Sequence, residues 1–194
     1  AVARAAALGW GVPFVPVDHL EGHLLSASLE VAGPSFPFLS LVVSGGHTTL
    51  YAARSVGQYE VLRQPVDAAA GEAFDKVARM LGLGYPGGPR VEALALAGNP
   101  RAVTFPMPRP TGRPHDMSFS GLKSAVRQHL ERHPGTPRAD VAASFQDTVA
   151  RYLVSRVREG AERTGIDRVA IGGGAAANTA LRAAILDSGL QAFI

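Results

Sequence analysis

The stretch FLSLVVSGGHTTLYAAR, residues 38–54, carries the strongest fold signal in this 194-residue chain. Phe38–Val43 is a near-continuous apolar run, which is typical of a buried strand. Ser44–His47 then predicts a turn, and Thr48–Arg54 predicts a second strand. A third strand at Tyr59–Gln64 completes three successive antiparallel strands.

On both sides of this region the chain alternates between helical and strand patterns. Apolar residues at helical spacing predict helices at Ala1–Gly9, Asp18–Glu30, Ala68–Leu83, Val91–Leu96, from Ser118 or Ser120 to about Arg132, Ala139–Thr164 and Asn178–Leu186. Short apolar runs predict further strands at Val12–Val17, Val169–Ile171 and Leu190–Ile194. This order predicts an α/β fold whose sheet begins with antiparallel strands.

The composition excludes several classes of protein. Because the chain has no cysteine, it has no disulfide, no thiolate metal ligand and no cysteine nucleophile. The sequence predicts neither a membrane span nor a signal peptide, so the cytoplasm is the expected location. A net charge of +3 permits an anionic partner without requiring one. Ala1 opens directly into a helix and Ile194 ends an apolar run, which predicts an internal piece of a longer protein.

A pair of histidines is the first candidate site. His19 and His23 are four residues apart, so a helix places them on one face, where two imidazoles can hold one divalent ion. Two solvent-facing histidines are the alternative. Glu21 stands three residues after Asp18 at capping-box spacing, which predicts a structural role. Leu20 occupies the position where a zinc protease needs Glu. Since catalytic metals usually have three protein ligands, a third must come from elsewhere.

Two glycine-rich turns follow predicted strands. Ser44-Gly45-Gly46 exposes backbone N–H groups that can bind an anion, although this stretch by itself favours a plain hairpin turn. Gly172-Gly173-Gly174 lets a ligand approach the helix that begins at Asn178, whose N-terminus favours phosphate. Tight packing of helix on sheet is the alternative there. The spacing of this second turn matches neither a Walker loop nor the dinucleotide fingerprint.

Two further stretches are weaker signals on their own. Glu72 and Lys76 are four residues apart, which predicts a solvated helix pair. Arg109, Arg113 and His115 lie in an extended segment that could contact phosphate or face solvent.

Taken together, these stretches resemble the TsaD family, the tRNA threonylcarbamoyladenosine biosynthesis proteins. The matching pieces, which follow the family's order over nearly the whole chain, are Val17–His23 (VDHLEGH), Val43–Thr48 (VSGGHT), Gly71–Lys76 (GEAFDK), Tyr85–Pro89 (YPGGP), Phe119–Lys123 (FSGLK), Ala143–Gln146 (ASFQ) and Gly172–Gly174 with Asn178. The resemblance implies the actin-like, Hsp70-like (ASKHA) two-lobed ATPase fold. It predicts that residues 1–36 are the tail of the first lobe, with the metal-ligand helix, and that residues 37–194 are a second lobe incomplete at its C-terminus.

The resemblance also implies a reaction and its components. A threonylcarbamoyl group moves from threonylcarbamoyl-adenylate to the N6 amine of the adenosine at position 37 of tRNAs that read codons starting with A. The implied metal ligands are His19 and His23, with iron or zinc as the ion. The implied substrate contacts are Val42, Val43, Ser44, Gly45, Gly46, Asp75, Gly88 and Asn178. The cleft of this fold can also hold ATP or ADP. The implied partners are tRNA, the smaller paralogue TsaB, the ATPase TsaE and the adenylate-forming enzyme TsaC.

The chain departs from the family pattern at three places. The opening strand motif and the C-terminal Asp that completes the metal site are absent, and Glu92 stands where many members have Asp. We therefore expect this chain alone to bind metal weakly and not to modify tRNA. Two other functions remain open: a non-catalytic scaffold or nucleotide-binding module of the same fold, and a phosphotransferase, which would have no need of the histidine pair.

Overall fold

A computed structural model describes residues 1–29, 32–110 and 116–194. Its centre is a five-stranded sheet in the order β3-β2-β1-β4-β5. The strands are β1 (Phe38–Val43), β2 (Thr48–Ser55), β3 (Gln58–Arg63), β4 (Arg168–Gly172) and β5 (Gln191–Phe193). The pairs β1–β2 and β2–β3 are antiparallel, which confirms the prediction from residues 38–64.

The strand β1 lies in the middle of the sheet, and every one of its side chains is buried. It pairs in parallel with β4, and this register sets Val42 beside Gly172. Because parallel strands end at the same edge of a sheet, the turn after β1 and the glycine turn after β4 come out side by side. This edge carries the candidate site.

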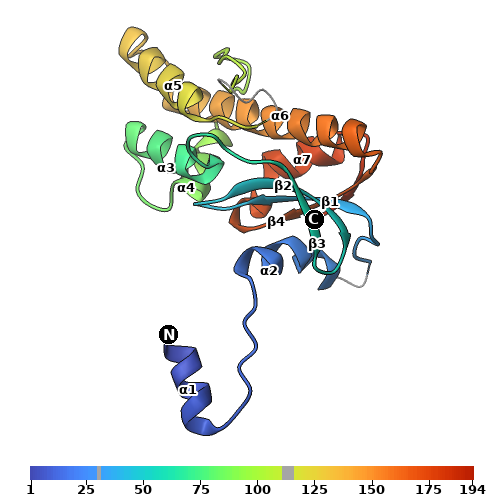
Figure 1. Cartoon of the computed structure of the whole chain (residues 1–194). Helices are drawn as coiled ribbons and strands as arrows, with labels where there is room; N and C mark the ends of the chain where they lie inside the picture. The colour runs from blue at the N-terminus through green and yellow to red at the C-terminus, as the bar shows by residue number, and fades with distance from the viewer. Residues whose placement is uncertain (30–31, 111–115) are drawn as a thin grey trace.

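The two faces of the sheet are covered unequally (Figure 1). The larger core lies between the sheet and the helices α3 (Ala70–Met80), α4 (Gly87–Ala95), α5 (Ser120–Arg132), α6 (Arg138–Thr164) and α7 (Thr179–Leu186). The predicted apolar face of α6 is buried, from Val141 to Val157. On the opposite face, α2 (His19–Leu25) and a short 3₁₀ helix (Ser26–Leu29) cover a smaller cluster around Leu24.

The N-terminal segment stands away from this body. The helix α1 (Val2–Trp10) forms as predicted and ends at Gly11, whose φ of 63° is the left-handed conformation that favours glycine. The strand predicted at Val12–Val17 is wrong, because the segment is extended but pairs with no described strand. Pro13 and Pro16 lack the N–H groups that a ladder needs, and its valines are exposed, Val17 by 77%.

The start of α4 and the cap of α5 differ from their predictions. α4 begins at Gly87 instead of Val91, since proline is tolerated in the first helical turn and Pro89 lies there. α5 begins at Ser120, but neither Ser118 nor Ser120 caps it. Instead, the Asp67 carboxylate accepts hydrogen bonds from both serine hydroxyls and from the backbone N–H groups of Phe119 and Ser120.

These hydrogen bonds lower the pKa of the Asp67 carboxyl. Burial by itself would raise the pKa of this carboxyl, but the hydrogen bonds from Ser118, Ser120 and the backbone outweigh burial and lower the pKa to about 2. The carboxylate therefore fixes the segment before α3 to the start of α5.

Among the described residues, no helix is long and apolar enough to cross a membrane. The division at residue 36 into a first-lobe tail and a second lobe stays a prediction.

Candidate functional site

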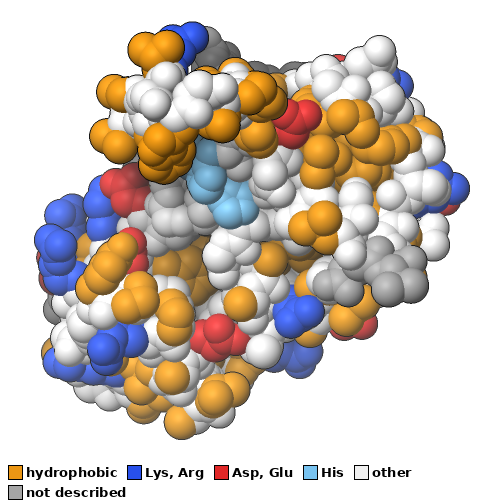
Figure 2. Space-filling model, turned by 90° about the horizontal axis from the view of Figure 1, so that it is seen from below, with side chains coloured by type: hydrophobic (Ala, Val, Ile, Leu, Met, Phe, Trp, Pro, Cys, Tyr) orange, Lys and Arg blue, Asp and Glu red, His pale blue; other side chains and the backbone are white. Residues whose placement is uncertain are grey.

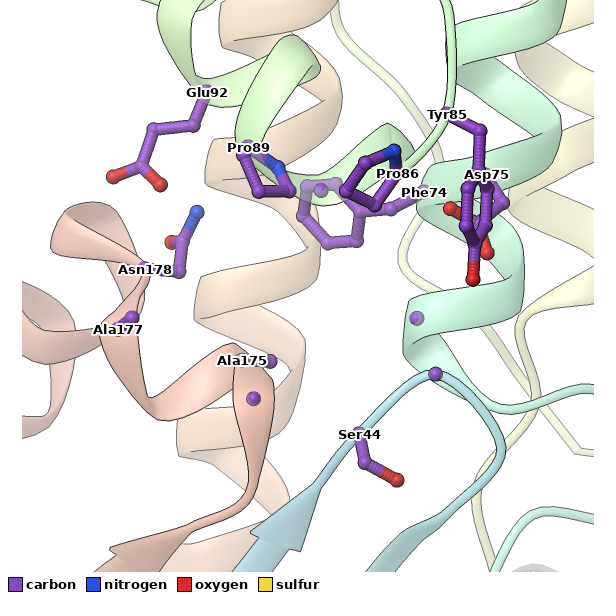
Figure 3. A pocket seen from close by; sticks show the side chains of 14 residues that line it. Ser44, Phe74, Asp75, Tyr85, Pro86, Pro89, Glu92, Ala175, Ala177 and Asn178 are labelled. Atoms are coloured by element: carbon purple, nitrogen blue, oxygen red, sulfur yellow. The ribbon is translucent and has the colours of Figure 1, made fainter.

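A cavity of about 320 Å³ opens at the sheet edge where β1 and β4 end (Figure 3). Four segments form its walls: the β1–β2 turn, α3, the start of α4 and the segment that leads into α7. The lining residues are Ser44, Gly45, Gly71, Phe74, Asp75, Tyr85, Pro86, Gly88, Pro89, Glu92, Gly174, Ala175, Ala177 and Asn178. The walls are therefore mostly apolar, with a few polar groups, as is usual for small-molecule sites.

The β1–β2 turn is a hydrogen-bonded hairpin that packs tightly on α3. The Ser44 N–H donates to the His47 carbonyl at 2.7 Å, and the His47 N–H donates to Ser44 Oγ at 3.1 Å. A Cβ at Gly71 would overlap the Ser44 carbonyl and lie 2.6 Å from the Gly45 Cα. Thr48 Oγ1 accepts from the Ala70 N–H at 2.8 Å, which joins β2 to the start of α3. The turn and the helix therefore form one rigid wall.

Asp75 joins α3 to α4. Its Oδ1 accepts a hydrogen bond from the Gly87 N–H at 2.7 Å, at the first residue of α4. A Cβ at Gly87 would lie 2.8 Å from that same oxygen, so only glycine permits this approach. Asp75 thus shapes the wall and also presents a carboxylate to the cavity.

The opposite wall is fixed by side chains at the start of α7. Asn178 Oδ1 accepts from the Leu181 N–H and caps the helix, while Asn178 Nδ2 donates to Gln146 Oε1 on α6 at 2.9 Å. Glu92 Oε1 accepts from both the Thr179 N–H at 2.8 Å and the Thr179 hydroxyl at 2.6 Å. Glu92 therefore bridges α4 and α7 across the cavity.

Five of the eight predicted substrate contacts line this cavity: Ser44, Gly45, Asp75, Gly88 and Asn178. Val42 and Val43 are buried within β1 beneath it, and Gly46 is exposed at the turn outside the lining set. Arg113 and His115 lie outside the described residues. The structure thus brings together stretches that are far apart in the sequence.

Nine of the fourteen lining residues are not among the predicted substrate contacts, and Gly71, Tyr85 and Glu92 are the three that show what the sequence left open. Gly71 was available as part of the Gly71–Lys76 motif, but only the approach to Ser44 shows why glycine is needed. Tyr85 belonged to a recognised motif without an assigned role. Glu92 stands where many members of the family have Asp, and only the structure shows that its carboxylate accepts hydrogen bonds from Thr179.

The histidine pair lies on α2, on the other side of the glycine turn. Asp18 caps this helix as predicted, since its Oδ1 accepts from the N–H groups of Leu20 and Glu21. Glu21 does not complete a capping box. Its carboxylate instead accepts a hydrogen bond from the Tyr59 hydroxyl at 2.7 Å. Figure 2 shows histidine side chains in a hollow on the face seen from below.

The two imidazoles converge. His19 Nε2 and His23 Nε2 lie 3.2 Å apart, and the ring planes meet at 74°. Two nitrogens bound at 2.0–2.1 Å to a tetrahedral ion would be separated by about 3.3 Å, so the pair fits two positions of such an ion. The same spacing fits a hydrogen bond between two neutral rings. Among the described residues, no group of three or more His, Asp or Glu side chains is placed to hold a metal.

The glycine turn at residues 172–174 lies between the histidine pair and the cavity. A Cβ at Gly172 would overlap the His23 carbonyl, so β4 touches the backbone of α2 there. Gly173 has a φ of 88° and packs on the Val43 carbonyl, and Gly174 lines the cavity. The glycine turn therefore packs tightly at its first two residues and opens to the cavity at its third.

The sheet order, with helices on both faces and a cavity at the edge where β1 and β4 end, defines the α/β class of actin-like, Hsp70-like ATPase folds. Two solved structures share it. HypF from T. kodakarensis matches with a TM-score of 0.75 and 16% identity, over 99% of this chain and 35% of that one. Component A of the Acidaminococcus fermentans (R)-2-hydroxyglutaryl-CoA dehydratase matches with a TM-score of 0.59 and 19% identity, over 97% of this chain and 65% of that one.

Sequence comparison narrows this class to a family. The family model "TsaD: tRNA N6-adenosine threonylcarbamoyltransferase" matches residues 1–193, and the chain belongs to this family. A relative of that name from Anaeromyxobacter dehalogenans (strain 2CP-1) is 50% identical over 185 residues, which are 94% of this chain. The match covers 55% of that relative, so the chain spans little more than half the length of such proteins.

Proposed function

We propose that this chain supplies the donor-binding part of a tRNA threonylcarbamoyltransferase. In this proposal the cavity holds the nucleotide end of threonylcarbamoyl-adenylate, and the acceptor is the N6 amine of adenosine 37 in tRNAs that read codons starting with A. The observation that carries the proposal is the meeting of the β1–β2 turn, Asp75, Gly88 and Asn178 around one cavity.

The proposed reaction needs placement more than activation. The N6 amine attacks the carbonyl carbon of the threonylcarbamoyl group, forming an N–C bond. The C–O bond to phosphate breaks, AMP leaves with the electron pair, and the amine loses a proton. Because the donor is a mixed anhydride, the chain's main task is to hold it still and exclude water. The packed wall of Ser44, Gly45 and Gly71 suits that task.

The histidine pair is proposed as part of a metal site. His19 and His23 would hold a divalent ion, iron or zinc, which supplies Lewis-acid polarisation of an oxygen when bound. The convergence of their Nε2 atoms at 3.2 Å supports this assignment. The third ligand is proposed to come from outside this chain, so binding by the pair alone is expected to be weak.

The partners are proposed from the family. They are tRNA, the smaller paralogue TsaB, the ATPase TsaE and the adenylate-forming TsaC, all acting in the cytoplasm.

A nucleotide-binding module without transfer activity is the second candidate. It is favoured by the fold neighbours, since one related structure is described as HypF in a phosphate- and nucleotide-bound form and another as a dehydratase activator with bound ADPNP. ATP or ADP would then occupy the same cavity.

A titration of the chain with AMP tests both proposals, because both require the cavity to bind a nucleotide. We expect AMP to bind the chain, and Asp75→Asn, which keeps the acceptor for Gly87 but removes the charge, to change its affinity. Asp187→Ala, a change in an exposed residue after α7, serves as the control. Absence of AMP binding would contradict both candidates. Transfer of labelled threonylcarbamoyl to tRNA, assayed with the partner proteins present, would then separate the transferase from the nucleotide-binding module.

A further inference from the structure

On the side opposite the histidine pair, the helix α2 is attached to the sheet by a hydrogen bond between two side chains. Tyr59, on the edge strand β3, donates its hydroxyl proton to Glu21 Oε1 at 2.7 Å. Both side chains are half-buried. They are 38 residues apart in the sequence, so this contact exists only in the folded chain.

Helix geometry makes this bond a control on the orientation of the histidines. At 100° per residue, Glu21 points about 180° away from the midpoint between His19 and His23. A bond on one side of a short helix therefore fixes the direction in which the opposite side faces. The Tyr59–Glu21 hydrogen bond is placed to restrict rotation of α2 about its own axis.

The other attachments of α2 act on its backbone. Ser40 Oγ donates to the Leu24 carbonyl at 3.3 Å, and Gly172 packs against the His23 carbonyl. These contacts set the height and position of the helix above the sheet. Leu24 adds apolar packing, with only 2% of its surface exposed. Such packing tolerates small rotations better than a directional hydrogen bond does.

We infer that Tyr59 and Glu21 are positioning residues that orient the two imidazoles for a divalent cation. This inference rests on the proposed metal site. Groups that orient metal ligands commonly change metal affinity by about 10–100-fold when they are removed. Here the effect passes through the helix instead of a direct bond to an imidazole, so a smaller change of about three- to tenfold is expected, at or below the lower limit of that range.

The experiment measures Zn²⁺ affinity of the metal-free chain by competition with a chromophoric indicator. We expect Tyr59→Phe and Glu21→Ala to weaken Zn²⁺ binding by about three- to tenfold. Glu21→Gln keeps an oxygen acceptor for the Tyr59 hydroxyl, so its affinity should stay close to that of the unchanged chain. Tyr51→Phe is the matched control, because Tyr51 belongs to the same cluster and its hydroxyl has no hydrogen-bond partner among the described residues.

Two further measurements keep the outcomes distinct. Helix content from circular dichroism shows that each variant is folded, and a purely structural role would lower stability while leaving Zn²⁺ affinity unchanged. That result for Tyr59→Phe and Glu21→Ala would overturn the inference. The double variant His19→Ala, His23→Ala tests the metal site itself. If it binds Zn²⁺ as well as the unchanged chain, the proposed metal site fails, whatever Tyr59 does.

Discussion

The cavity and the histidine pair lie on two sides of the same glycine turn, yet they are built differently. The cavity walls are joined to one another by hydrogen bonds and by approaches that only glycine permits, as at Gly71 and Gly87. The histidine pair lies on a seven-residue helix over a small apolar cluster, and His19 is exposed. The difference indicates that this chain fixes the shape of the cavity by itself, whereas the pair needs more ligands to make a full metal site.

The largest expected effect on AMP binding comes from breaking the cavity wall with Gly71→Ala. The added Cβ would overlap the Ser44 carbonyl and approach the Gly45 Cα, both backbone atoms, so the turn or α3 must move. Overpacking of this kind costs about 1–3 kcal/mol. Since the movement falls in the cavity wall, we expect AMP affinity to drop by about tenfold or more, measured by calorimetric titration.

The matched control for this change is Gly121→Ala on α5. A Cβ there meets nothing within 4 Å, and replacing a helical glycine by alanine stabilises by about 0.5–1 kcal/mol. AMP binding should be unaffected. If Gly71→Ala bound AMP as tightly as Gly121→Ala does, the wall would not be rigid.

The next effect concerns Asp67, which joins the segment before α3 to the start of α5. Asp67→Ala removes the acceptor at the start of α5 and should lower the free energy of unfolding at pH 7 by about 1–2 kcal/mol, as for other lost caps. The folded-state pKa of about 2 lies below the ordinary value of 3.8, so the stabilisation is present above pH 3.8 and is lost as the pH falls toward 2.

Urea unfolding at several pH values tests this prediction. The difference between the unchanged chain and Asp67→Ala should shrink as the pH falls below about 4. A difference that stays constant from pH 7 to pH 2 would show that the charge on Asp67 is not what stabilises α5.

Asp67 also shows where sequence reasoning stops. The strands β1 and β2 could be predicted because their signals are local: an apolar run, a glycine turn and a second apolar run. The acceptor for α5 lies 51 residues before Ser118, and nothing in the local sequence marks it. A serine before a helix is usually its cap, so the local rule chose the wrong residue.

The candidate site divides in the same way. The motifs that line the cavity could be named from the sequence, because each contains glycine or a polar residue at a strand or helix end. Their convergence depends on the parallel register of β1 and β4, which only the fold shows. The strand prediction at Val12–Val17 is wrong because the local signal was present but the fold supplies no partner. An apolar run without a neighbouring strand has no ladder to join.

A smaller effect is expected from the bridge between Glu92 and Thr179. Glu92→Ala removes both hydrogen bonds that join α4 to α7, and net hydrogen-bond contributions are about 0.5–1.5 kcal/mol each. Because part of that loss falls on the cavity shape, we expect AMP affinity to weaken by about two- to fivefold. Thr179→Val, which keeps the backbone donor, should have the smaller effect of the two.

The control for this pair is Glu162→Ala, which removes an exposed carboxylate from α6 that does not line the cavity. It should leave AMP affinity unchanged in the same titration. Equal affinities for Glu92→Ala and Glu162→Ala would show that the bridge does not shape the cavity.

The smallest effect is expected where the chain is least packed, at the end of α1. Trp10 is 79% exposed, so Trp10→Ala removes little buried apolar surface, and the free energy of unfolding should change by less than about 0.5 kcal/mol. Leu24→Ala, in the cluster beneath the histidine pair, should cost about 2–5 kcal/mol by comparison. Urea unfolding of both variants measures the two values. A loss above about 1.5 kcal/mol for Trp10→Ala would mean that α1 packs on the body of the protein. The face of the sheet that carries the histidine pair would then be more enclosed than the comparison of the pair with the cavity assumes.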